Sequence, residues 1–163
     1  MMREERAKLT AQYAAGYAEV MAALEGISAA ELDWKPAPKE WSAREVAHHL
    51  ADSEMIAAVR LRRMLVEDEA RILPYDPDDL ARGLRYAARP HALALTLFQA
   101  VRAETAQLLE GLGEAEWERA ARHPRTGRYP VEQWLRDYAG HAHEHADQIR
   151  ANRRQWRESG ARG

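Results

Sequence analysis

Apolar side chains recur at every third or fourth position along most of the chain, a spacing that predicts α-helices. Four long stretches follow this pattern: residues 3–25, 42–66, 90 to 111 or 113, and 130–157. Two shorter stretches, 28–31 and 114–122, predict small helical inserts in the connections. The pattern therefore predicts an all-α protein built as a four-helix bundle, with short helices between the long ones.

Polar residues mark where the helices begin. Ser28 with Glu31 and Ser42 with Glu45 both have capping-box spacing, in which the hydroxyl and the carboxylate each bind an unpaired backbone amide. The connection 67–89 is long for a compact domain. It is typical either of a segment that covers a functional site or of a crossover between distant bundle helices, and the sequence leaves both open.

Composition agrees with a helical fold and narrows the class of protein. The chain has 163 residues, which fits a single domain spanning 1–163. It has no cysteine, which excludes disulfides and thiolate metal ligands and fits a cytoplasmic protein. With 24 basic and 26 acidic residues it has no charge excess suited to nucleic acid, and we expect no such partner. No export signal or apolar stretch of membrane-spanning length is expected either.

Histidines carry the candidate chemistry. In the last predicted helix, positions 134, 138, 141, 145 and 148 fall on one stripe, which begins with Trp134 and should face the core. His141 and His145 are therefore one turn apart on this inward stripe, the spacing that lets two imidazoles meet one metal ion. His49 lies on the inward stripe of the second long helix and is the third expected ligand. Three imidazoles suit zinc, nickel, iron(II) or copper, and leave a coordination position open for substrate.

The alternative interpretation is that these histidines are ordinary hydrogen-bonded core residues, because the pattern does not show that the two helices are neighbours. We expect His48 near the boundary or exposed, His143 at the surface, and His91 and His123 in turns at the surface, from which either could reach the pocket mouth. Weaker candidates line or support the pocket: Gln148 as a partner of a ligand, Asp137 as an orienting acid, Ser53 on the inward stripe, and Glu54 as an acid or base.

Two segments resemble a known family. The segment Trp41–Glu54, WSAREVAHHLADSE, is similar to the "W-S-x-x-E-x-x-x-H-L-x-D-S-E" motif of the DinB/YfiT-like superfamily. The segment 141–149, HAHEHADQI, is similar to its "H-x-x-x-H-x-x-Q-I" motif. Trp117 and the stretch 123–127 resemble further parts of the YfiT-like branch, so the resemblance spans about residues 5–155. His143 and Glu144 inside the second motif depart from many members and leave the polarity of the pocket open.

The resemblance implies a four-helix bundle with an unusual helix order, commonly a homodimer, and a metal site on His49, His141 and His145. It implies nickel or zinc, with iron or manganese as alternatives. Three functions follow as expectations. The protein is a transferase that joins a low-molecular-weight thiol to an electrophile, a hydrolase that activates water on the metal, or a non-catalytic metal-binding dimer associated with stress.

Overall fold

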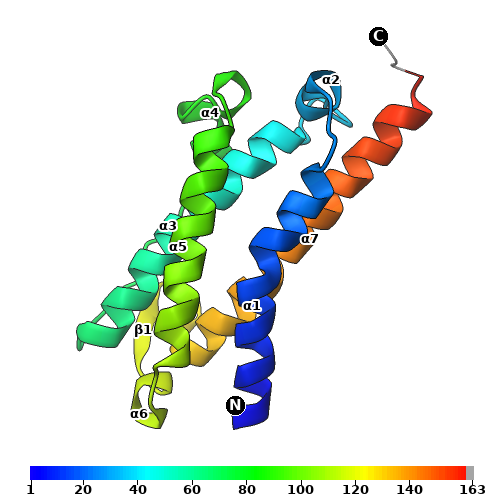
Figure 1. Ribbon diagram of the computed structural model, residues 1–163. Helices are drawn as coiled ribbons and strands as arrows, with labels where there is room; N and C mark the ends of the chain where they lie inside the picture. Colours follow the sequence, from blue (N-terminus) through cyan, green and yellow to red (C-terminus); the bar gives the residue numbers. More distant parts are fainter. Residues whose placement is uncertain (161–163) are drawn as a thin grey trace.

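Four long helices form the frame of the molecule, which a computed structural model describes for residues 1–160 (Figure 1). They are α1 (Arg3–Leu24), α3 (Ala43–Val66), α5 (Ala92–Glu110) and α7 (Val131–Glu158). The shorter elements are α2 (Ala29–Asp33), α4 (Pro77–Gly83), the 3-10 helix η1 (Tyr86–Ala88), α6 (Glu114–Trp117), and the strands β1 (Ala120–His123) and β2 (Gly127–Pro130). The predicted four-helix bundle is confirmed. Residues 161–163 of the predicted domain lie outside the described range.

Two helices begin at the capping boxes that the sequence predicted. At the start of α3, the Ser42 amide donates to the Glu45 carboxylate at 2.8 Å, and the Glu45 amide donates to the Ser42 hydroxyl at 3.3 Å. Ser28 and Glu31 make the same reciprocal pair at the start of α2. Each box satisfies amides that no helical carbonyl can reach, so α3 starts at a defined residue.

The bundle consists of two parallel helix pairs. Helices α1 and α7 run in the same direction, because Met1 pairs with Glu132 near their starts and Glu19 pairs with Arg150 further along. Helices α3 and α5 are also parallel, since Arg62 reaches Thr105 late in both. Around the bundle, α7 contacts α1 and α3, and α5 contacts α3 and α1. Parallel neighbours need a long crossover between them, which explains the length of the connection from α3 to α5.

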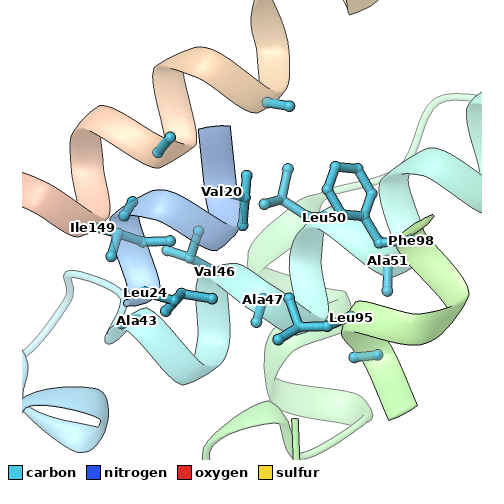
Figure 2. Close-up of a cluster of buried hydrophobic side chains, with 14 of the residues drawn as sticks. Val20, Leu24, Ala43, Val46, Ala47, Leu50, Ala51, Leu95, Phe98 and Ile149 are labelled. Carbon is cyan, nitrogen blue, oxygen red and sulfur yellow. The ribbon is translucent and has the colours of Figure 1, made fainter. Parts of the chain in front are cut away.

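The apolar core lies where the four helices meet. One cluster joins Val20 and Leu24 of α1, Leu50 of α3, Phe98 of α5 and Ile149 of α7, and Figure 2 shows their side chains converging. All five are at most 7 % exposed. Burial of side chains of this size supplies most of the driving force for folding, at roughly 1.5–3 kcal/mol each.

The side of α7 that faces the core differs from the prediction. Its buried residues are mainly on a neighbouring stripe and most of them are small or aliphatic: Val131, Trp134, Leu135, Ala139, Ala142, Ala146 and Ile149. The predicted stripe from Trp134 through His141 and His145 is only half-buried beyond Trp134. The alanines determine this orientation because they let α1 approach closely: a Cβ built on Gly16 would lie 2.7 Å from the Ala142 Cβ. The histidines therefore border the core beside α3.

The helical insert predicted at 114–122 is shorter than expected, because α6 ends at Trp117 and residues 120–122 belong to strand β1. Further short elements that the sequence did not predict lie in the connections. Strands β1 and β2 form an antiparallel hairpin that pairs Ala120 with Pro130 and His123 with Gly127. The predicted turn at 123–127 is its tip, where Gly127 has a φ of +78°. The crossover 67–91 contains α4 and η1, and residue Arg71 bridges to Arg122 of the hairpin. No helix within residues 1–160 is long and apolar enough to cross a membrane.

Candidate metal centre

Three histidines from two helices meet where α3 and α7 contact each other. The Nε2 atom of His141 lies 3.3 Å from Nε2 of His49 and 3.2 Å from Nε2 of His145, and one ligand atom from each ring lies within 4.8 Å of the other two. Nitrogen atoms around a tetrahedral zinc ion, each about 2.0–2.1 Å from it, are about 3.3–3.4 Å apart. Both separations therefore match a tetrahedral transition-metal site, in which three protein ligands would leave a fourth position without a protein ligand. We call these three residues the histidine cluster.

Gln148 fixes the orientation of one ring in the cluster. Its side-chain oxygen lies 2.8 Å from Nδ1 of His145, so Nδ1 carries the proton and donates it in this hydrogen bond. The lone pair of the His145 Nε2 atom then points towards the other two rings. Histidines that bind metals usually have such a partner, which fixes both the tautomer and the ring plane.

Burial keeps the cluster neutral. It lowers the pKa of both His49 and His141 to about 3, and each ring is further disfavoured as a cation by the neighbouring His145. The pKa of His145 is also lowered by burial, against the opposing effect of Gln148. Neutral imidazole is the form that binds a metal, so the three rings are ready to bind at neutral pH without losing a proton.

Two aromatic side chains enclose the cluster. The Trp41 ring lies 4.6 Å from the His49 ring and stacks on the His145 ring at 6.4 Å, measured between centroids. Tyr138 meets the edge of His141 at 6.0 Å from the opposite direction along α7. These rings cover part of the cluster and limit the access of water to it.

The crossover from α3 to α5 also contacts this region. Asp78 of α4 accepts a hydrogen bond from the Trp41 indole nitrogen at 2.9 Å, and Tyr86 of η1 donates to Asp52 of α3 at 2.5 Å. The segment therefore links two parallel helices and also holds the ring that covers His49. Both interpretations that the sequence left open apply.

Glu54 occupies a different position from the one expected of a pocket acid or base. Its side chain is 1 % exposed and turns into the bundle, where it pairs with Arg102 of α5 at 2.5 Å and accepts a hydrogen bond from the Tyr13 hydroxyl. Burial raises the pKa of the Glu54 carboxyl, while the positive charge of Arg102 opposes the shift. The structure therefore assigns Glu54 to a buried ion pair and leaves it without an open face towards substrate.

Comparison with known proteins identifies relatives of this chain. The family model of the DinB superfamily matches residues 12–149, which include all three histidines. The chain belongs to the DinB superfamily. A relative from Oceanobacillus iheyensis is 33 % identical over 118 residues, 71 % of this chain and 68 % of the relative. YfiT from Bacillus subtilis is 29 % identical over 133 residues, 81 % of this chain and 75 % of its own length. Both carry the name "putative metal-dependent hydrolase".

A solved structure of Bacillus subtilis YfiT has the same fold. The two structures superpose with a TM-score of 0.86 at 27 % identity, over 98 % of this chain and 90 % of the other, and YfiT is described as having an unusual four-helix bundle topology. The parallel pairing of α1 with α7 and of α3 with α5 is unlike an up-down-up-down bundle, in which neighbouring helices are antiparallel.

The remaining predicted residues of this DinB chain fall in several environments. Gln148 contacts His145, as the sequence predicted. Ser53 is 3 % exposed, one turn after His49. Asp137 does not reach an imidazole: its oxygens accept hydrogen bonds from Tyr129 at 2.6 Å and Gln133 at 2.7 Å. It lies on the side of α7 that faces the hairpin, which the sequence did not reveal.

Two histidines are more buried than predicted. His48, expected near the boundary or exposed, is 2 % exposed, because Tyr86 of the crossover stacks on its ring at 5.4 Å and the Arg89 carbonyl lies 3.1 Å from its Nε2. His143, expected at the surface, is half-buried and bonds the Gln12 carbonyl of α1 at 2.9 Å. Neither ring joins the histidine cluster.

Of the two histidines predicted in turns, His91 lies in a bend, whereas His123 is the last residue of strand β1, next to the hairpin turn. His91 is the residue before α5 and is half-buried. The Nδ1 atom of His123 accepts hydrogen bonds from the backbone amides of Arg125 and Thr126, each at 3.2 Å, which closes the hairpin tip. His123 also lines a cavity beside Tyr138.

Sequence reasoning missed two aromatic contacts of the cluster. Trp41 was part of the family motif, but its place outside the helix gave no reason to expect a ring above His49. The stripe predicts that Tyr138 faces the core, but the Tyr138 hydroxyl accepts a hydrogen bond from Arg60 at 3.2 Å. A tyrosine three residues before a candidate ligand on the same helical stripe is the signal that could have located it.

Proposed function

We propose that His49, His141 and His145 hold one divalent transition metal, and that this protein transfers a low-molecular-weight thiol to an electrophilic compound. The observation that carries the proposal is the pair of Nε2 separations, 3.2 and 3.3 Å, which match the spacing of nitrogen ligands in a tetrahedral site. All three ligands are neutral nitrogens, which favours zinc or nickel, with iron as an alternative; manganese prefers oxygen ligands.

A bound divalent cation lowers the pKa of a thiol or water molecule that contacts it, and so favours the nucleophilic form at neutral pH. The protein's own contribution is to hold the three rings neutral and to keep the His145 ring fixed through Gln148. The rings of Trp41 and Tyr138 lie against His49 and His141 and restrict bulk water around the cluster. In the transfer, a sulfur–carbon bond forms, the leaving group departs with its electron pair, and the thiol proton passes to solvent.

The surroundings of the cluster favour a thiol over water as the nucleophile. A thiol has a pKa of about 8.5 and water one of about 15.7, so a thiol needs far less help to lose its proton. The two acids that the sequence suggested as helpers are engaged elsewhere. Glu54 is paired with Arg102, and Asp137 is bonded to Tyr129 and Gln133. Because neither of these two carboxylates can act as a base at the cluster, the site suits the more acidic nucleophile.

Hydrolysis of an ester or amide is the second candidate. The observation that favours it is the name shared by the relatives from Oceanobacillus iheyensis and Bacillus subtilis, which refers to a metal-dependent hydrolase. It uses the same three ligands, so substitution of a ligand alone does not separate the two reactions.

A two-substrate assay separates them. Zinc- or nickel-loaded protein is incubated with 2-mercaptoethanol and 1-chloro-2,4-dinitrobenzene, and in parallel with 4-nitrophenyl acetate. We expect faster thiol loss with the wild-type protein and none above background with His49→Ala. The matched control, His143→Ala, removes a histidine outside the cluster and should retain metal and activity.

Other outcomes decide against the transferase. Ester turnover that depends on His49, without thiol transfer, would favour the hydrolase. Absence of both reactions across several thiols and esters, in protein with full metal content, would reject both enzymes in favour of a metal-binding protein without catalysis.

A further inference from the structure

A small cavity lies beside the histidine cluster, between α7, the second half of α3, the hairpin and the crossover. Its volume is about 230 Å³, and its polar lining comes from Arg60, Tyr75, His123, Tyr129, Asp137 and Tyr138. Complete small-molecule sites usually measure roughly 300–1,000 Å³. This cavity is therefore of a size to hold one end of a ligand rather than a whole molecule.

Tyr138 is a wall common to the cavity and the histidine cluster. Its ring contacts the edge of His141 at 6.0 Å between centroids, and its hydroxyl is on the cavity side, bonded to Arg60 at 3.2 Å. A ligand with one end at the histidine cluster could thus extend past Tyr138 and place its other end near Arg60.

Arg60 is held in place without an acidic partner. Its guanidinium lies over the Tyr75 ring at 5.4 Å and donates to the Tyr138 hydroxyl and to the Leu73 carbonyl. Within residues 1–160, no carboxylate lies at ion-pair distance from it, whereas Arg63, one turn further along α3, pairs with Glu67 at 2.8 Å. Two of the five guanidinium hydrogens are engaged in these bonds, so donors remain for a ligand.

The acidic residue in the lining does not neutralise Arg60 by direct contact. Both oxygens of Asp137 already accept hydrogen bonds, one from Tyr129 at 2.6 Å and one from Gln133 at 2.7 Å. The hydroxyl of Tyr129 is turned towards Asp137 by this bond. The Arg60 guanidinium can therefore pair with an anion that enters the cavity.

We propose that Arg60 binds a carboxylate of the substrate, while the reacting group of the same molecule lies at the histidine cluster. The planar guanidinium matches a carboxylate with two parallel hydrogen bonds, and its stacking on Tyr75 keeps the fork in one orientation. The substrate class is thus a small carboxylic acid or a compound with a carboxylate arm. The inference rests on the proposed function for the position of the reacting group, but the binding of the carboxylate is testable without catalysis.

Binding of succinate to the metal-loaded protein tests the inference directly. Calorimetry should show that Arg60→Met weakens succinate binding about 10- to 100-fold, the range of a lost hydrogen bond to a charged group. Arg60→Lys should recover part of the affinity, because it restores the charge without the planar fork. Arg63→Met is the matched control: it removes one positive charge from the same helix outside the cavity, and should leave affinity unchanged.

Two results would overturn the inference. If Arg60→Met binds succinate as tightly as wild type does, the acid binds elsewhere, for instance on the metal itself. If neutral succinamide binds as tightly as succinate, shape rather than charge governs the cavity. Either result leaves the proposed reaction standing, and absence of thiol or ester turnover leaves the carboxylate subsite standing.

Two matched substrate pairs locate the carboxylate. Mercaptoacetate compared with 2-mercaptoethanol tests the thiol, and iodoacetate compared with iodoacetamide tests the electrophile; the protein has no cysteine that could consume either reagent. For each pair, the rate with the acidic compound is divided by the rate with the neutral one. In one of the pairs, Arg60→Met should lower this ratio towards its value in the uncatalysed reaction. A ratio that Arg60→Met leaves unchanged in both pairs would contradict a substrate carboxylate at this residue.

Discussion

Replacing Arg102 should destabilise the whole bundle, because this one side chain of α5 connects the other three long helices. Its guanidinium donates to the Tyr13 carbonyl of α1 at 2.6 Å, to Glu54 of α3 at 2.5 Å and to the Tyr138 carbonyl of α7 at 3.4 Å. Arg102 and Glu54 are each 1 % exposed. Arg102→Met leaves the Glu54 carboxylate buried without its partner, and Glu54→Gln leaves the guanidinium in the same state.

The loss should be a large part of the total stability. Removal of one partner from a buried ion pair costs about 3–5 kcal/mol, while domains of this kind are stable by about 5–15 kcal/mol. For a chain of this length, 1 kcal/mol shifts Tm by about 2–4 °C, so each single variant should melt about 6–20 °C lower. Arg63→Met, which breaks the exposed pair with Glu67, should cost at most about 1 kcal/mol.

Urea and thermal denaturation followed by circular dichroism measure these changes. The double variant Arg102→Met with Glu54→Gln removes both charges, so it should lose less free energy of unfolding than the two single variants added together. A single variant that loses under about 1 kcal/mol would refute the reasoning. So would a double variant whose loss equals the sum, because the two charges would then be independent.

Three further predictions concern the same helices. Gln148→Leu removes the acceptor for Nδ1 of His145, and should weaken zinc binding about 10- to 100-fold in a chelator competition, with unchanged affinity contradicting its role. Gly16→Ala places a Cβ 2.6 Å from a guanidinium nitrogen of Arg102, so it should destabilise by about 1–3 kcal/mol in urea, despite the roughly 1 kcal/mol that alanine adds to a helix. Burial lowers the pKa of all three histidines of the cluster, and the pKa of His49 falls to about 3. The pKa of a histidine in the unfolded chain is about 6.5. The unfolded chain therefore binds more protons between these values, and the metal-free protein should lose stability as pH falls below about 6.5; a Tm independent of pH from 7 to 4 would contradict this.

The metal-site candidates could be found in the sequence because helical geometry is local. The spacing of His141 and His145 places both rings on one face whatever surrounds them. The choice of His49 over His48 also followed from local periodicity, but the burial of His48 did not. That burial depends on η1, a segment almost forty residues further along the chain, which folds back over α3.

Other features depended on contacts that a single helix does not reveal. Alanines determine which side of α7 faces the core. Each buries little apolar surface, but together they let α1 and its Gly16 approach closely. The partner of Glu54 is on α5, and its identity follows only from the order of helices around the bundle. The strands of the hairpin have four residues each and carry arginine and alanine, so neither length nor composition distinguished them from a loop.

The most direct test of the central claim is a crystal structure of the zinc-loaded protein with anomalous diffraction data at the zinc absorption edge. The account predicts one strong anomalous peak per chain, between α3 and α7. It should lie about 2.0–2.1 Å from the Nε2 atoms of His49, His141 and His145. A peak that lacks any of these three ligands, or protein that takes up no zinc while its histidines keep ordinary side-chain neighbours, would contradict the account.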